Sequence, residues 1–122
     1  MELKTQWNEE KGFWDIAVSG EVFYDDCLQE LNNLLEQMPK PSGNLVLLTI
    51  EAADLNLTNT DIYYLVRLFF ERHYTPFKKM AVMTNQQKNL DKVKFLELCA
   101  VNRGMDVFVA QDRAAAEERL LR

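Results

Sequence analysis

Side chains from which small active sites are built are scarce in this chain. Its 122 residues include one histidine, His73, and two cysteines, Cys27 and Cys99, and its serines are Ser19 and Ser42. Nucleophilic catalysis needs a base beside the nucleophile, so a catalytic triad has almost nothing here to draw on. We therefore predict that the protein is not an enzyme.

Metal-binding and phosphate-binding patterns are missing as well. No two histidine or cysteine residues lie close together in the sequence, no aspartate-rich calcium loop occurs, and the four glycines are isolated from one another. Cys27 and Cys99 lie among leucines in segments with helical patterns, which favours buried apolar thiols over a disulfide or a reactive pair. We predict no metal and no cofactor.

A leader sequence and long apolar runs are also absent from the sequence. The first residues lack the basic segment followed by an apolar stretch that a signal peptide has. The apolar runs are only a few residues long, far short of the roughly 20 residues that cross a bilayer. We expect a cytoplasmic protein with no membrane span.

The charge of the chain disfavours nucleic acid as the main partner. Its formal net charge is −5, whereas binding to a phosphate backbone requires a concentrated basic face. Most of a local basic excess after residue 77 comes from five lysines, Lys78, Lys79, Lys88, Lys92 and Lys94. We expect these lysines to form a solvated surface rather than an anion site.

What the chain does contain is short apolar runs whose period alternates between that of strands and that of helices. Its length is that of one domain, and we predict a single domain over residues 1–122. Strands are expected at 3–7, 13–18, 45–50, 80–84 and 105–110, and helices after Asp25 or Asp26, over 58–74, around 90–100 and after Asp112. The first two strands, joined by a polar loop with a glycine, form a predicted hairpin.

Strands that alternate with helices pair in parallel through right-handed crossovers. We therefore predict an α/β fold with about four helices and a mixed, mostly parallel sheet of four or five strands. The hairpin should be antiparallel, and the three later strands should be parallel to one another.

The order of these elements resembles the STAS domain of anti-sigma-factor antagonists over essentially the whole chain. The resemblance is carried by the hairpin start, the short strand before Thr58, the helix after it, and the closing run Phe108-Val109-Ala110-Gln111-Asp112 with its final helix. Uncharacterised SpoIIAA-like proteins are the most similar branch. The resemblance implies a SpoIIAA-like fold and a non-enzymatic protein switch, in which a kinase phosphorylates a serine at the start of the second helix.

This chain departs from the regulators at that helix start. The regulators carry an Asp-Ser pair with a glycine two residues after the serine, whereas this chain has Leu57-Thr58 or Asn59-Thr60, followed by Thr60 or Ile62 in place of the glycine. Thr58 with Asp61 also fits a capping box, in which the hydroxyl and the acid satisfy the helix start. Thr58 and Thr60 are therefore candidates either for phosphoacceptors or for helix caps.

Two functions remain open from the sequence. The first is a protein-interaction module, regulatory in the manner of STAS domains, that acts through the second-helix surface. The second is a small carrier of an apolar ligand such as a lipid, because aromatic residues crowd one segment, namely Tyr63, Phe69, Phe70, Tyr74 and Phe77.

A helical projection of the second helix separates a buried face from a candidate contact surface. His73 falls on the apolar face with Ile62 and Val66, which favours a partly buried histidine. Tyr64 and Leu68 fall together on the polar side, where a pair of large apolar groups is typical of an interface anchor. We take Asn59, Tyr64 and Leu68 as candidate residues for a homodimer or partner contact. The alternative is that the hairpin or a neighbouring loop covers the pair.

Overall fold

The computed structural model describes residues 1–37, 44–71 and 77–122, which form nine elements: two initial strands, followed by alternating helices and strands. In chain order they are β1 (Glu2–Asn8), β2 (Phe13–Phe23), α1 (Tyr24–Gln37), β3 (Leu45–Asn56), α2 (Asn59–Glu71), β4 (Lys79–Thr84), α3 (Gln87–Asn102), β5 (Val107–Val109) and α4 (Arg113–Leu120). The predicted order is confirmed. His73, Tyr74 and the side chains of Phe69 and Phe70 lie outside the described residues, so the buried position of His73 stays a prediction.

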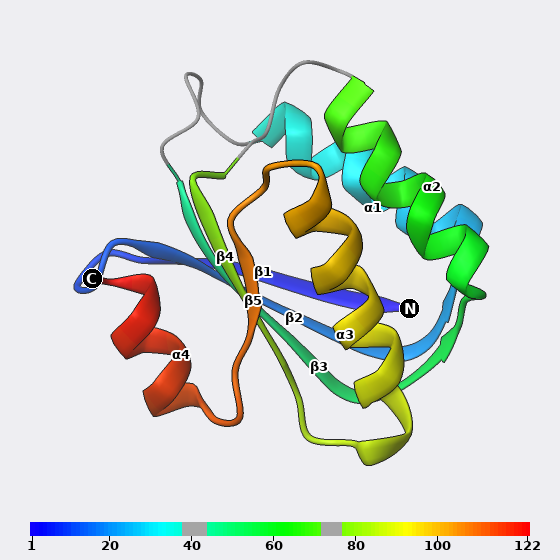
Figure 1. The fold of residues 1–122 in the computed structure, drawn as a ribbon. Coiled ribbons are helices and arrows are strands. Elements are labelled where there is room, and N and C mark those ends of the chain that lie inside the picture. Colours follow the sequence, from blue (N-terminus) through cyan, green and yellow to red (C-terminus); the bar gives the residue numbers. More distant parts are fainter. Residues whose placement is uncertain (38–43, 72–76) are drawn as a thin grey trace.

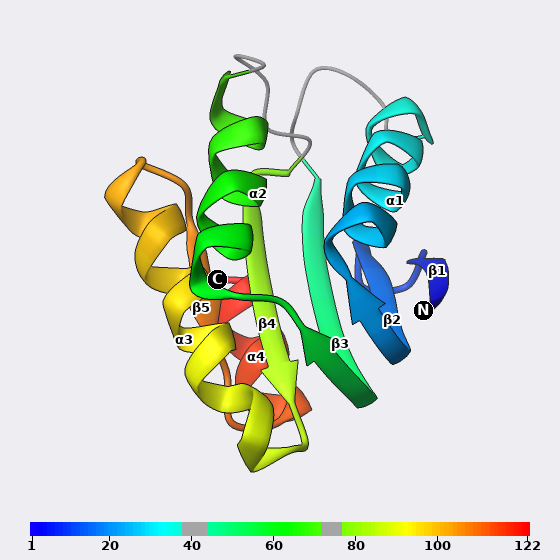
Figure 2. The same ribbon diagram turned by 90° about the vertical axis from the view of Figure 1, so that its right-hand side faces the viewer.

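The five strands form one sheet in the order β1-β2-β3-β4-β5. β1 pairs with β2 antiparallel, and every later pair is parallel, as predicted. From β2 to β5, each strand lies on the same side of the strand before it in the sequence. Right-handed crossovers therefore place α1, α2 and α3 on the same face of the sheet. Figures 1 and 2 show these three helices on one face and α4 on the other.

β2 and β3 exceed their predicted lengths most, because a change of register lets them continue, whereas β5 covers only part of the predicted 105–110. The pairing of β2 with β3 shifts by one residue between Val18 and Gly20, where Gly20 has a φ of 81° that glycine adopts readily. Beyond the shift, β2 continues to Phe23 and β3 to Asn56. The shift also keeps Leu55 on the helix-covered face, although it breaks the alternation followed by Leu48 and Ile50.

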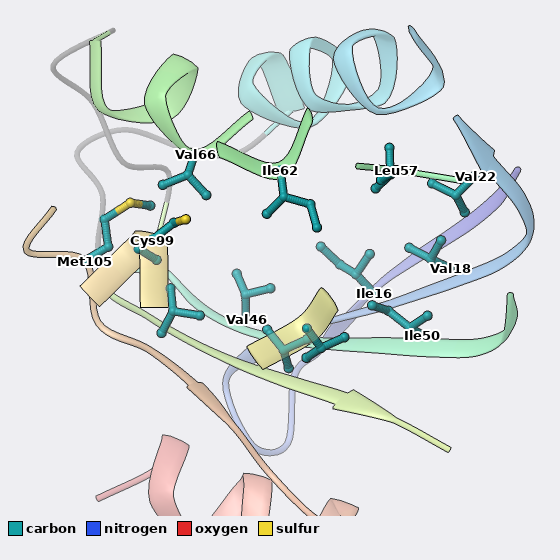
Figure 3. Close-up of a cluster of buried hydrophobic side chains, with 14 of the residues drawn as sticks. Ile16, Val18, Val22, Val46, Ile50, Leu57, Ile62, Val66, Cys99 and Met105 are labelled. Atoms are coloured by element: carbon teal, nitrogen blue, oxygen red, sulfur yellow. The ribbon is translucent and has the colours of Figure 1, made fainter. Parts of the chain in front are cut away.

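Buried side chains form one cluster on each face of the sheet. The larger cluster lies under α1, α2 and α3, and Figure 3 shows Ile62 and Val66 of α2 pointing toward Ile16 and Val46 of the sheet. The smaller cluster lies under α4 and consists of Phe13, Leu47, Ala81, Phe108, Ala110, Ala116 and Leu120. The domain therefore has three layers, with the sheet in the middle.

Polar contacts stabilise the start of α4 and link α4 to the β1–β2 hairpin. The Asp112 side chain caps α4 by accepting from the Ala115 N–H at 2.8 Å. Arg113 pairs with Asp15 at 2.5 Å, and Lys11 pairs with Glu117 at 2.8 Å. The hydrogen bond from Lys11 is the main cause that holds the pKa of the Glu117 carboxyl below its ordinary value.

Candidate functional site

The start of α2 is closed by reciprocal hydrogen bonds between Thr58 and Asp61. The Asp61 N–H donates to Thr58 Oγ1 at 3.0 Å, and the Thr58 N–H donates to Asp61 Oδ2 at 2.9 Å. This is the capping-box geometry, which satisfies two donors that a helix start leaves free. Thr58, Asn59 and Thr60 are all exposed.

The exposed surface of α2 includes two adjacent tyrosines. Tyr64 is 48% exposed and Tyr63 is 39% exposed, and their rings meet edge to face with centroids 5.6 Å apart. The guanidinium of Arg103, at the end of α3, lies 5.1 Å from the centre of the Tyr63 ring. Leu68 is half-buried, so the structure brings Tyr64 together with Tyr63 and leaves Leu68 less accessible than the projection suggested.

An apolar cavity of about 230 Å³, partly open to solvent, lies between the sheet and helices α1, α2 and α3. Its walls come from strands β1 to β4, from α1, α2 and α3, and from the connections between them. The cavity leaves Leu48 incompletely packed. Leu48 lies between Ile16 and Val82 in the middle of the sheet, on the face covered by α1, α2 and α3, and it is only half-buried. Figure 3 shows part of this region, with Leu57 and Ile62 above Ile16 and Ile50.

Two charged side chains, Glu30 of α1 and Lys92 of α3, contribute to the cavity wall. The Lys92 ammonium donates a hydrogen bond to the Leu57 carbonyl oxygen, just before α2 begins. Lys92 is half-buried, which corrects the expectation that it belongs to a solvated lysine surface; Lys78, Lys88 and Lys94 are exposed, and Lys79 is half-buried. The difference arises because Lys92 lies on the side of α3 that faces the cavity.

Cys27 also lines the cavity, and its surroundings make it a poor nucleophile. Burial, together with the negative charges of Asp26 and Asp61, raises the pKa of the Cys27 thiol to about 11. Only the thiolate is reactive, so the protonated Cys27 thiol serves as an apolar group in the cavity wall. Cys99 is buried in the core under α3, and both thiols are free.

Neither metal-binding nor membrane-spanning features appear in the described part of the chain. Across residues 1–37, 44–71 and 77–122, no three His, Cys, Asp or Glu side chains are grouped so that they could hold a metal ion. No helix among these residues is long and apolar enough to cross a membrane.

Comparison with known proteins identifies the fold. No family model and no curated protein matches the sequence. The structure matches that of an uncharacterised protein of the DUF3478 family with a SpoIIAA-like fold, from Shewanella loihica PV-4, with a TM-score of 0.61. The match covers 98% of this chain and 92% of that one, at 14% sequence identity. The chain has a SpoIIAA-like fold.

The cavity is the feature that sequence reasoning missed. Each element contributes only a few of its lining residues, so no local spacing marks them as a set. Their apolar character is also what a filled core would require. The signal in the sequence was a charged residue on an apolar helical face: Lys92 falls with Leu96 and Cys99, and Glu30 falls with Cys27 and Leu34.

Proposed function

We propose that this chain is a non-enzymatic STAS-type module that binds a small apolar ligand inside the domain. The cavity between the sheet and α1, α2 and α3 carries this proposal. Protein interiors contain few voids larger than a water molecule. A volume of about 230 Å³ lined almost entirely by apolar side chains is much larger than such voids.

The composition of the wall selects an apolar ligand over water. Water is retained in a cavity only where several polar groups can hold it, and a dry cavity of about 150 Å³ lined with Leu, Ile and Phe binds benzene or xenon. Here the wall is formed by apolar side chains apart from Glu30 and Lys92. Binding would replace lost packing contacts with ligand contacts and bury apolar ligand surface, which is the main source of affinity in such pockets.

A cavity-filling substitution tests this function. We expect titration calorimetry to detect octanol binding to the parent protein and to show affinity reduced about tenfold or more in Leu48→Trp, a loss of about 1.4 kcal/mol. The added ring occupies the cavity, so Leu48→Trp should melt no lower than the parent. Leu98→Trp is the matched control, because Leu98 is 55% exposed on α3. Absence of octanol binding to the parent, or equal binding to both variants, contradicts the proposal.

The surface of α2 supports a second candidate function, a protein contact that includes a homodimer. Exposed tyrosines next to an arginine are enriched at the centres of interfaces, and Tyr63, Tyr64 and Arg103 form such a group. Asn59 and Leu68 are the further candidate contact residues. We expect Tyr64→Ser, alone and with Leu68→Ser, to weaken self-association in sedimentation velocity without loss of the folded circular dichroism spectrum. A parent protein that stays monomeric at every concentration removes the homodimer.

Phosphorylation at the start of α2 would be the regulatory part of a STAS-type function. Thr58 Oγ1 already accepts the Asp61 N–H, and the Asp61 carboxylate lies against the Thr58 N–H. A phosphate on Thr58 would therefore meet a neighbouring negative charge, which favours Thr60 as the acceptor of the two. Peptide mapping after incubation with a cognate kinase tests this, and phosphate found only on other residues would reject it.

A further inference from the structure

The two charged side chains of the cavity wall come from opposite sides of the helix layer. Glu30 belongs to α1, which packs on β2, whereas Lys92 belongs to α3, which packs on β4 and β5. Figure 2 shows α1 and α3 on either side of α2. Met1 and Leu3, from the edge strand β1 and its start, also line the cavity. The cavity therefore has a chemically distinct end near α3, marked by a positive charge.

The positive charge of Lys92 has no countercharge in the described structure. Its ammonium donates to the neutral carbonyl oxygen of Leu57, and Lys92 makes no ion pair with any residue that the structure describes. Lys88, one turn earlier on the same helix, is exposed and does pair with a carboxylate, that of Asp54. An ammonium has three donors, and a charge beside an apolar cavity is costly unless an opposite charge compensates it.

Opposing electrostatic contributions meet at the start of α2, at this end of the cavity: the helix N-terminus is partly positive, whereas the Asp61 carboxylate in the first turn is negative. Leu57, whose carbonyl accepts from Lys92, lies directly before the Thr58 cap of a 13-residue helix. The N-terminal end of a helix carries a partial positive charge that favours anions. Glu30 has the opposite effect at α1, because its carboxylate would repel an anionic group placed there.

The volume of the cavity suits a ligand of modest length. At about 230 Å³ it exceeds the dry cavity of about 150 Å³ that binds benzene, so a hydrocarbon chain somewhat larger than benzene fits. We propose that the cavity binds a medium-chain carboxylate, with the carboxylate at Lys92 and the hydrocarbon chain extending under α2 toward α1 and β1. This inference rests on the proposed function, since it assigns a head group to a ligand of the same cavity.

Removing the charge of Lys92 while keeping its apolar stem tests the head group. We expect calorimetry to show that the parent binds octanoate more tightly than octanol, which has the same chain length. Lys92→Met should weaken octanoate binding about tenfold or more, as expected for a charged hydrogen bond, and leave octanol binding equal or stronger. Lys94→Met is the control, because Lys94 is exposed on the same helix and does not line the cavity, and it should bind both ligands like the parent.

The pattern of binding separates the two proposals. If octanol and octanoate bind equally to the parent and to Lys92→Met, or if octylamine binds best, the head-group inference is overturned while the apolar cavity stands as a ligand site. If neither octanol nor octanoate binds to the parent, the proposed function itself fails. As a second readout, the carboxyl carbon of bound octanoate should titrate at a lower pH in the parent than in Lys92→Met, because a nearby positive charge favours the ionised form.

Discussion

Leu47 and Leu48 are neighbours on the central strand and face opposite sides of the same sheet. Leu47 faces α4 and is completely buried, with an exposed fraction of 0%, whereas Leu48 faces α1, α2 and α3 and is only half-buried. The face covered by one short helix is thus more tightly packed at this point than the face covered by three. The number of covering helices does not decide how well a sheet is packed.

The difference follows from the side chains that meet on each face. Under α4, the large rings of Phe13 and Phe108 project from the sheet, and the small Ala116 lets the helix approach closely. On the other face, the sheet offers mostly aliphatic side chains such as Ile16, Val46 and Leu48. These leave space beneath the helices, and the proposed function assigns that space to a ligand.

Shortening Leu47 should cause the largest loss of stability, and shortening Leu48 should cause a smaller one. Leu47→Ala should cost about 3–5 kcal/mol of unfolding free energy, because it opens a new cavity in a closely packed cluster. Leu48→Ala should cost about 2 kcal/mol or less, because the removed atoms already border empty space. Urea denaturation of both variants measures the difference. Equal losses would contradict the contrast between the faces.

Removing the N-terminal cap of α2 should cause an intermediate loss of stability. Thr58→Ala removes the acceptor of the Asp61 N–H and should cost about 1 kcal/mol of unfolding free energy. Thr60→Ala, an exposed residue of the first helical turn, should stay within about 0.5 kcal/mol of the parent. Thermal or urea unfolding that ranks the two variants equally would show that the cap does not stabilise the helix.

Neutralising Glu117, a residue of α4, should cause the smallest loss of stability, and this loss should depend on pH. Because the folded-state pKa of Glu117 is lowered by Lys11 and Arg113, its ionised form stabilises the fold above the unfolded-state pKa. That stabilisation is lost as the pH falls through the folded-state value. Glu117→Gln should therefore be less stable than the parent at neutral pH and equal to it in acid, in unfolding curves recorded across the acid range. Glu118→Gln, whose carboxylate is mostly exposed, should match the parent throughout.

The fold was largely predictable because it depends on local periodicity. Alternating strands and helices, the hairpin loop ending near Gly12, and the Thr58–Asp61 cap are all visible in short stretches of sequence, and the structure contains each of them. The full length of β2 and β3 was not predictable, because the register shift at Gly20 depends on pairing between distant segments.

The candidate site was less predictable, since it depends on distances between elements. The exposure of Tyr64 follows from its helical position, but the half-buried state of Leu68 depends on what packs beside α2. The volume of the cavity depends on how far the helices lie from the sheet, which no residue pattern specifies. Lys92 was assigned to a solvated surface by composition, and only the position of α3 beside Leu57 shows that it faces the cavity.

Methyl NMR spectroscopy can locate a ligand bound between the sheet and the three helices, because methyl groups on the two faces of the sheet give separate signals. Octanol should be titrated into protein labelled at the methyl groups of Leu, Ile and Val. We predict chemical-shift changes and ligand contacts at Leu34, Leu48 and Ile50, which line the cavity, and none at Leu47 or Leu120, which pack with α4. Equal changes on both faces, changes confined to the exposed Leu98 and Val101, or no change at all would contradict a ligand site between the sheet and the three helices.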